Sequence, residues 1–379
     1  MKRLALWELG FRPFYLLASV FAALSVPLWA LQFSGRLPQP YLAGPVWHAH
    51  EMLFGYTMAV IAGFLFTAVR NWTQQPTPSG ALLAAFAALW VAGRVLVLTP
   101  FGLAAAIVNA AFPVAVAAAI AVPLARSGNR RNYFFVALLV ACGAAALCAH
   151  LSLLGIIDWP ARLSLRVGLD VVLFIVAVVA GRVIPMFTNN GVPGAGARRI
   201  VALERVALAS VLALWASDVL QIAALSAAIA AAGAAAHAYR LILWRPWKTL
   251  HAPLVWILHA SYAWIPIHLA LRVMAYAGLV PDTLATHALT IGVIGGMTLG
   301  MMTRTARGHT GRPLAAGGAE VACYVLVQVA AIVRVAGGAM LPASYLGTIA
   351  VSAACWSLAF AIYAIRYAPI LALPREDVV

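Results

Sequence analysis

Long apolar stretches, separated by short polar or basic connections, follow one another along the whole chain. A helix needs about 20 apolar residues to cross the hydrocarbon core of a bilayer, so the pattern predicts about twelve membrane-spanning helices. They lie near residues 12–34, 46–68, 80–98, 102–125, 133–155, 163–188, 201–217, 219–239, 252–278, 284–306, 319–340 and 345–366. Asp218 is the obvious break within 201–239, so the seventh and eighth helices are the least clearly separated. We expect an all-α polytopic membrane protein in which residues 1–379 form a single integral membrane domain.

The composition supports this fold class and excludes several functions. The chain is 64% hydrophobic and 9% charged, whereas a soluble domain carries about 25% charged residues. The four cysteines all lie in apolar stretches and form no CxxC pair, which is typical of buried structural thiols. The sequence has no Walker loop, Rossmann fingerprint or nucleophile elbow. Nucleotide-driven transport and hydrolase chemistry therefore have no support.

The net charge of +15 has the distribution of a membrane protein rather than of a nucleic-acid-binding protein. Basic residues lie at the ends of apolar segments and form no continuous stripe with aromatic residues. Roughly eighteen of the 25 Lys and Arg residues fall in the even-numbered connections, which predicts that both termini are cytoplasmic. The first apolar run has no small-residue cleavage site, so we expect the first helix to be retained. The expected partner is the lipid bilayer, and nucleic acid is not a partner.

Histidines gather toward the outer side of this predicted topology. His48 and His50 begin the second helix, His150 ends the fifth, and the ninth and tenth helices hold further histidines. Ionisable residues within spans are functional candidates, and imidazole is well suited to iron and copper. The alternative is a set of helix–helix hydrogen bonds. We predict a metal site whose ligands come from the outer half of the membrane and from His259 just below it: His48, His50, His259, His268 and His287.

The spacing of these residues suggests how they divide the roles. His48 and His50 are about 200° apart around a regular helix, so one metal cannot easily take both. Glu51 shares a face with His48 and could orient it through a hydrogen bond, or supply protons to the chemistry. His259 and His268 also lie on near-opposite faces, unless Pro266 kinks the helix between them. Several helices must therefore contribute ligands.

Two other patterns bear on this site. Four arginines fall in the outer parts of their spans, where acidic residues are few: Arg94, Arg166, Arg272 and Arg334. Haem propionates would supply anionic partners for such guanidinium groups, and the alternative is snorkelling toward lipid headgroups. In the tenth helix, the four-residue spacing of Gly292, Gly296 and Gly300 predicts a smooth face for close helix contact.

Four segments carry a family resemblance over essentially the whole chain: FRPFYLLA, PVWHAHEMLFGYTMAVIAGFLFTAVRNWT, GRVIPMFTNN and THALTIGVIGGMTLGMMTRTARGHTGRPL. The chain resembles the NnrS family. The resemblance implies a multi-pass protein of the bacterial inner membrane, linked to nitric oxide, denitrification and nitrosative stress. It also implies haem (b-type), copper, and a distant similarity to the catalytic subunit of haem-copper oxidases. Of the histidines in the matching motifs, His48, His50 and His287 share the outer side of the predicted topology, whereas His309 falls on its cytoplasmic side.

We therefore expect a haem protein, or a haem-copper protein, acting in nitric oxide metabolism. Histidines of the second, ninth and tenth helices would hold the haem near the periplasmic side, with His48 or His50 as an axial ligand. Nitric oxide would be the small-molecule ligand, and the electron donor is unidentified. If the protein turns nitric oxide over, it is a haem-dependent oxidoreductase. The alternatives are a transporter of a small anion or an iron-nitrosyl species without a redox cofactor, and a non-catalytic scaffold for denitrification enzymes. No adjacent HH pair of the kind used at oxidase copper sites is present.

Overall fold

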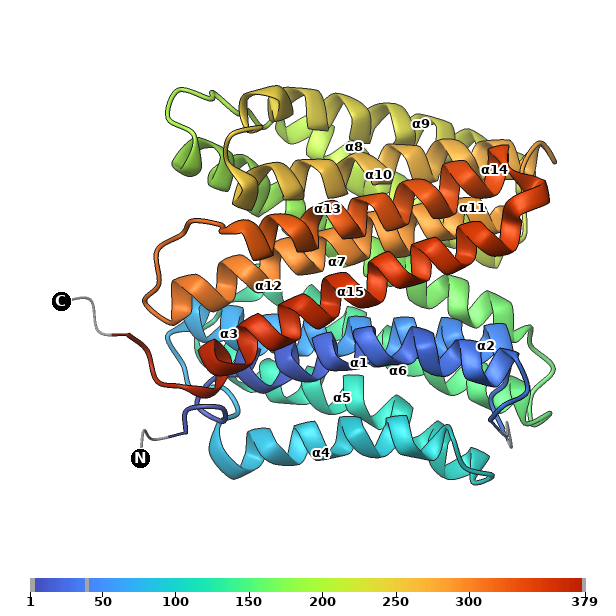
Figure 1. The fold of residues 1–379 in the computed structure, drawn as a ribbon, viewed down its shortest axis with the longest axis horizontal. Helices are drawn as coiled ribbons and strands as arrows, with labels where there is room; N and C mark the ends of the chain where they lie inside the picture. Colours follow the sequence, from blue (N-terminus) through green and yellow to red (C-terminus); the bar gives the residue numbers. More distant parts are fainter. Residues whose placement is uncertain (1–3, 38–40, 377–379) are drawn as a thin grey trace. The chain divides into compact units, whose positions relative to one another are not determined.

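The computed structural model describes residues 4–37 and 41–376, and every regular element in these residues is a helix (Figure 1). Several elements join end to end, which gives twelve helices in the described residues, one for each predicted window. The elements are α1 (Phe11–Phe33), α2 (Gly44–His50), η1 (Glu51–Thr57), α3 (Met58–Thr73), α4 (Gly80–Leu96), α5 (Gly102–Arg126), η2 (Arg130–Asn132), α6 (Phe134–Leu153), α7 (Ala161–Gly191), α8 (Val201–Val219), α9 (Ala223–Leu243), η3 (Pro246–Lys248), α10 (Pro253–Tyr276), α11 (Asp282–His287), η4 (Ala288–Gly295), α12 (Gly296–His309), α13 (Gly318–Ile332), η5 (Val333–Gly337), α14 (Gly338–Met340), η6 (Pro342–Ser344) and α15 (Tyr345–Ala372).

Ten of these helices are long and apolar enough to cross a membrane, so the chain is a multi-pass membrane protein. The other two are α4, which is shorter, and α8, which carries Glu204, Arg205 and Asp218. Both were predicted as spans from their apolar composition alone. Glu204 and Asp218 pair with the buried arginines Arg240 and Arg272, as described below, and this explains how the two acids are accommodated in an otherwise apolar helix.

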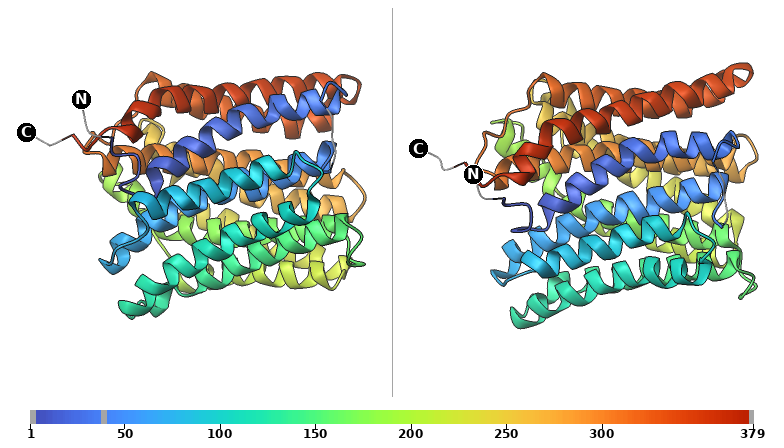
Figure 2. Two further views of the ribbon diagram at one scale, coloured as in Figure 1. Left: turned by 90° about the horizontal axis from the view of Figure 1, so that it is seen from below. Right: turned by 60° about the horizontal axis from the view of Figure 1, so that its bottom comes forward.

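The chain divides into two compact units. Unit 1 comprises residues 1–171, 305–312 and 363–379, and unit 2 comprises residues 172–304 and 313–362. In unit 1, α1 packs on α3, α3 packs on α5, and α5 lies between α4 and α6. Figure 2 shows α4, α5 and α6 as neighbouring helices, coloured cyan to green. In unit 2, α9 packs against α8 and α10, and α10 packs against α11 and η4.

Glycines bring two helices of unit 2 close together. A Cβ atom added at Gly292 would overlap Trp264, and one added at Gly296 would overlap Ser261. At Gly300, the added atom would lie 2.8 Å from Leu258 Cδ2. All three neighbours belong to α10, so the predicted glycine face is confirmed and its partner is α10.

Two π-helical segments interrupt helices directly after a histidine. The segment η1 follows His50, and η4 follows His287. Such wide turns are rare and are often found at functional sites. They also change which side chains share a helix face, because residues after the turn are rotated relative to those before it. The face relations expected for a regular helix therefore do not hold around His50.

Candidate functional site

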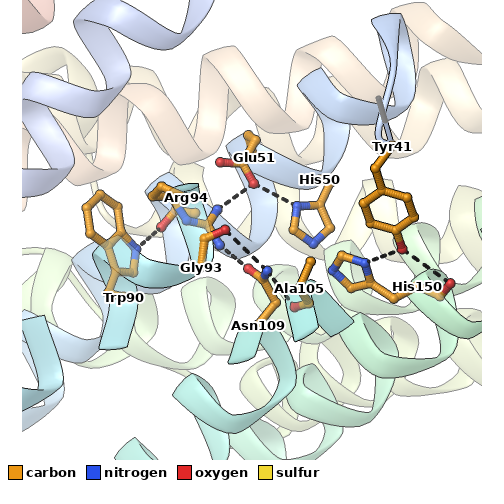
Figure 3. Close-up of polar contacts among 10 residues, drawn as sticks. Tyr41, His50, Glu51, Trp90, Gly93, Arg94, Ala105, Asn109 and His150 are labelled. Carbon is orange, nitrogen blue, oxygen red and sulfur yellow. Dashed lines mark hydrogen bonds and ion pairs between the residues drawn. The ribbon is translucent and has the colours of Figure 1, made fainter. Parts of the chain in front are cut away.

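The site in unit 1 is built on the junction between α2 and η1. His50 and Glu51 are buried there, with exposed fractions of 1% and 0%. His50 Nδ1 lies 2.8 Å from Glu51 Oε1 (Figure 3). Because a carboxylate oxygen accepts, Nδ1 carries the proton and His50 Nε2 presents its lone pair. Glu51 thus orients His50, whereas the sequence pointed to His48. His48 is half-buried, and its ring lies 4.9 Å from that of Trp29.

Arg94 holds the Glu51 carboxylate from the other side. Its NH1 donates to Glu51 Oε1 at 2.6 Å, and its NH2 donates to Asn109 Oδ1. Asn109 is itself held by a 2.8 Å hydrogen bond from its Nδ2 to Ala105 O. A Cβ atom at Gly55 would overlap Arg94 NH1, so only glycine at this position leaves room for the pair. The result is a buried ion pair with charge-assisted hydrogen bonds on both sides of the guanidinium group.

A second imidazole meets His50 in this site. His150, which is fully buried in α6, has its Nδ1 2.8 Å from the Tyr41 hydroxyl, and the two rings are stacked. The His50 and His150 rings lie 4.6 Å apart between centroids, at 72°. Neither Nε2 atom has a hydrogen-bond partner, and in Figure 3 the rings face each other through these nitrogens. Glu51 Oε2 is also buried without a hydrogen-bond partner. Two buried imidazole nitrogens thus face each other without hydrogen bonds.

His150 and Tyr41 were not among the predicted site residues. The sequence placed His150 at the same depth as His50, and this was the available signal. It could not show that α6 brings His150 to His50, because two further helices, α4 and α5, lie between them in the chain order. Tyr41 precedes α2, outside the candidate spans, and gave no signal of its own.

Tyr41 is held as a neutral phenol. Burial raises the pKa of Tyr41 to about 12, from its ordinary value of 10.0. In the unfolded chain the phenol ionises near pH 10, whereas in the folded protein it keeps its proton to about pH 12. The folded state therefore binds more protons than the unfolded state between these values, and stability falls as the pH rises through them.

This pKa shift predicts an alkaline phenotype for Tyr41→Phe. The variant should lose less stability than the wild type between pH 10 and 12, because it has no phenol to ionise on unfolding. Thermal unfolding in detergent as a function of pH measures this difference, with Tyr133→Phe, an exposed residue of unit 1, as the control. Identical alkaline profiles for Tyr41→Phe and the wild type would contradict the assignment.

The other predicted ligands lie in unit 2. His259 Nε2 is 2.8 Å from Thr188 Oγ1. His268 Nδ1 donates to Ala285 O at 2.7 Å, and His287 Nδ1 donates to Thr283 O at 2.6 Å. In the last two rings, a backbone carbonyl fixes the proton on Nδ1 and leaves Nε2 as the nitrogen that can ligate a metal. Across residues 4–37 and 41–376, no three or more His, Cys, Asp or Glu residues gather closely enough to hold a metal ion. A single centre shared by the five predicted histidines stays a prediction.

Two of the four predicted propionate-binding arginines have carboxylate partners in the protein. Arg94 pairs with Glu51, and Arg272 pairs with Asp218, which also accepts a 2.6 Å hydrogen bond from the Tyr276 hydroxyl. For Arg94 and Arg272, the expectation that the protein has too few acidic residues to pair with them is wrong. Arg334 NH2 donates to the Tyr345 hydroxyl at 3.0 Å, and its NH1 is buried without a hydrogen-bond partner. Arg166 is half-buried in α7.

Comparison with known protein families supports the resemblance of the sequence motifs. A family model described as NnrS protein matches residues 5–375, which is nearly the whole chain. The chain belongs to the NnrS family. No curated protein matches it.

This NnrS chain has a second buried polar network, in unit 2, which the sequence did not reveal. Arg240 donates to both carboxylate oxygens of Glu204, at 2.8 and 2.7 Å, and to the Tyr262 hydroxyl at 2.8 Å. His237 Nε2 faces the Ala207 carbonyl, so its Nδ1 accepts the hydrogen bond from Tyr262 at 2.6 Å. Every group in this chain of contacts is paired, so we interpret the network as a structural link between α8, α9 and α10.

The network requires a glycine in α7. A Cβ atom at Gly181 would overlap Arg240 NH2 and lie 2.5 Å from Glu204 Oε2. We expect Gly181→Ala to destabilise the protein by about 1–3 kcal/mol, the usual cost of overpacking a buried site. Thermal unfolding in detergent measures the effect. Gly318→Ala is the matched control, because an added Cβ there meets nothing within 4 Å. Equal unfolding temperatures for the two variants would contradict this account.

Proposed function

We propose that this NnrS protein binds copper and haem and acts in nitric oxide metabolism. The family links the chain to nitric oxide and denitrification. The observation that supports a metal in unit 1 is the pair of buried imidazole nitrogens, His50 Nε2 and His150 Nε2, that face each other without hydrogen-bond partners. Buried polar atoms are almost always paired in native proteins, so two such atoms together favour a ligand between them.

The donor set fits copper. Imidazole nitrogens suit copper and iron, and ligating histidines usually donate their other N–H to a carboxylate or another hydrogen-bond acceptor. His50 has Glu51 in that position, and His150 has Tyr41. Copper(I) is stable with few ligands, so we propose that these two imidazole nitrogens hold it.

The same geometry does not fit a haem between these two rings. A haem held by two imidazoles would need room for its macrocycle between the two rings. The centroids of His50 and His150 lie 4.6 Å apart. We therefore assign copper to His50 and His150, in place of the axial haem role expected for His50 from the sequence.

The haem is assigned to the histidines of unit 2. His268 and His287 both have Nδ1 fixed by a backbone carbonyl, the arrangement that directs Nε2 to a metal. Arg334, with a buried NH1 lacking a hydrogen-bond partner, is suited to a propionate. When bound, haem iron and copper would supply centres that coordinate nitric oxide and exchange electrons. The chain's own residues hold these centres in an apolar interior, where nitric oxide, itself small and apolar, dissolves.

Within the copper site, the role of Glu51 and Arg94 is positional. Arg94 fixes the Glu51 carboxylate, and the carboxylate fixes the proton of His50 on Nδ1. His50 Nε2 is therefore presented with its lone pair toward His150. Glu51 Oε2 can also hold a proton near the site, as expected if the chemistry of nitric oxide consumes protons.

Copper analysis and an optical spectrum of the purified protein, made with ample haem and copper, test the proposal. We expect one copper per chain and a Soret band that shifts when nitric oxide is added to the reduced protein. The alternative transporter predicts substrate flux into vesicles with neither copper nor a haem band. Protein that lacks both under these conditions, yet transports nitrite, would overturn the metal proposal.

A further inference from the structure

The segments FRPF and TARGHTGR, which the proposed function does not use, come together at one end of unit 1. The rings of Phe11 and His309 lie 5.6 Å apart, and Asn71 Nδ2 is 3.5 Å from His309 Nε2. The start and end of the described chain meet at the same place, where Ala5 N donates to Ala372 O at 2.8 Å. Positive charge at the ends of the apolar segments predicts that this end is cytoplasmic.

Three arginines and a histidine gather there. Arg12 is buried, and its NH1 donates to Leu371 O at 2.9 Å and to Leu373 O at 2.6 Å. Arg312 pairs with Glu376, and Arg375 lies beside the same segment, because Glu376 N donates to Thr310 O at 2.9 Å. Like charges that lie close together repel one another. Gathering these groups therefore costs free energy of folding unless anions offset their positive charge.

Among the acidic residues that the structure describes, Glu376 and Glu8 lie near this charge. Glu376 Oε1 accepts from Arg312 NH2 at 2.6 Å, but its side chain is 60% exposed, so the pair is weak. Glu8 acts on Arg12 from an exposed position. Two donor atoms of the cluster are left buried without hydrogen-bond partners, Arg12 Nε and Arg312 NH1. Arg12 is only 2% exposed, so its vacant donor cannot be satisfied by bulk water.

We propose that Arg12, Arg312 and Arg375 form a binding site for a phosphate group, with His309 beside it. Guanidinium groups match phosphate oxygens in a bidentate fork, so a phosphate group held by Arg312 and Arg375 would offset the positive charge beside the buried Arg12. Arg12 is the second residue of α1, a candidate membrane span, so the site lies at the end of a span. Phospholipid phosphates lie at that level, and free phosphate carries the same chemistry.

Thermal unfolding of the full-length protein, purified in a neutral detergent and stripped of lipid, tests the site. One arm adds dioleoylphosphatidylglycerol, with dioleoylphosphatidylcholine as its control, and the other adds inorganic phosphate against chloride at equal ionic strength. A ligand that binds only the folded state raises the unfolding temperature. We expect phosphatidylglycerol to raise it, and Arg312→Gln and Arg375→Gln each to weaken the apparent affinity about ten-fold.

Arg130→Gln is the matched control, since Arg130 is an exposed arginine of unit 1 away from the cluster. Arg375 is exposed, so Arg375→Gln retains the fold even if Arg312→Gln does not. If inorganic phosphate alone gives the arginine-dependent rise, the site stands and its occupant is free phosphate. If neither probe raises the unfolding temperature, or if Arg130→Gln weakens the response as much as the cluster variants, the site is refuted.

Discussion

His50→Ala is expected to lower the affinity of the protein for copper by at least about 100-fold. Changes that merely disturb the hydrogen-bond partner of a ligating histidine cost 10–100-fold in metal affinity, so loss of one of the two imidazole nitrogens costs more. The buried position of His50 excludes water as an easy substitute ligand. Competition with a copper(I) chelator of known affinity, followed by metal analysis of the protein fraction, measures the loss.

His48→Ala provides the control for this experiment. His48 is two residues away on the same helix, and its ring lies against Trp29, with the ring centroids 4.9 Å apart. We expect His48→Ala to keep its copper, and His150→Ala to lose copper as His50→Ala does. Haem content should be unchanged in all three variants. A His50→Ala protein that retained one copper per chain at wild-type affinity would contradict the assignment.

Arg94→Met is expected to destabilise the protein by about 3–5 kcal/mol, the cost of leaving one buried member of an ion pair without its partner. Glu51 is 0% exposed, and without Arg94 its Oε1 would keep the hydrogen bond from His50 Nδ1. The double variant Glu51→Gln with Arg94→Met should recover much of this loss, since neither charge is then buried alone. Unfolding by a denaturing detergent, monitored by tryptophan fluorescence, measures all of these stabilities.

Arg162→Met is the matched control for the removal of an arginine from unit 1, because Arg162 is exposed at the start of α7. It should change the free energy of unfolding by less than about 0.5 kcal/mol. If Arg94→Met were as mild as Arg162→Met, or if the double variant were less stable than Arg94→Met alone, the buried pair would not carry the stability assigned to it.

The helices of this protein could be predicted from the sequence because the signal is local. A run of about 20 apolar residues determines a span whatever surrounds it, and the twelve predicted windows each correspond to a helix. The same local reasoning predicted the glycine face of η4 and α12. It did not predict the π-helical turn after His50, because no residue in EMLFGYT marks such a turn by itself.

The site could be predicted only in part, because its contacts join residues far apart in the chain. Depth along each helix is readable from sequence, and it singled out His50, Glu51 and Arg94 as candidates. Which helices lie side by side cannot be read from the sequence in this way. Glu51 and Arg94 are 43 residues apart, and Tyr41 and His150 are 109 residues apart. The sequence therefore left Arg94 in apparent need of a cofactor anion, when the protein itself supplies the carboxylate.

X-ray absorption at the copper K-edge of the copper-loaded protein tests the central claim most directly. With copper(I) held by His50 and His150, the spectrum should show two imidazole nitrogens at about 2 Å, with multiple scattering from the rings. Both imidazole signals should disappear in the double variant His50→Ala with His150→Ala. A copper site dominated by sulfur, or an imidazole signal unchanged in the double variant, would contradict the account.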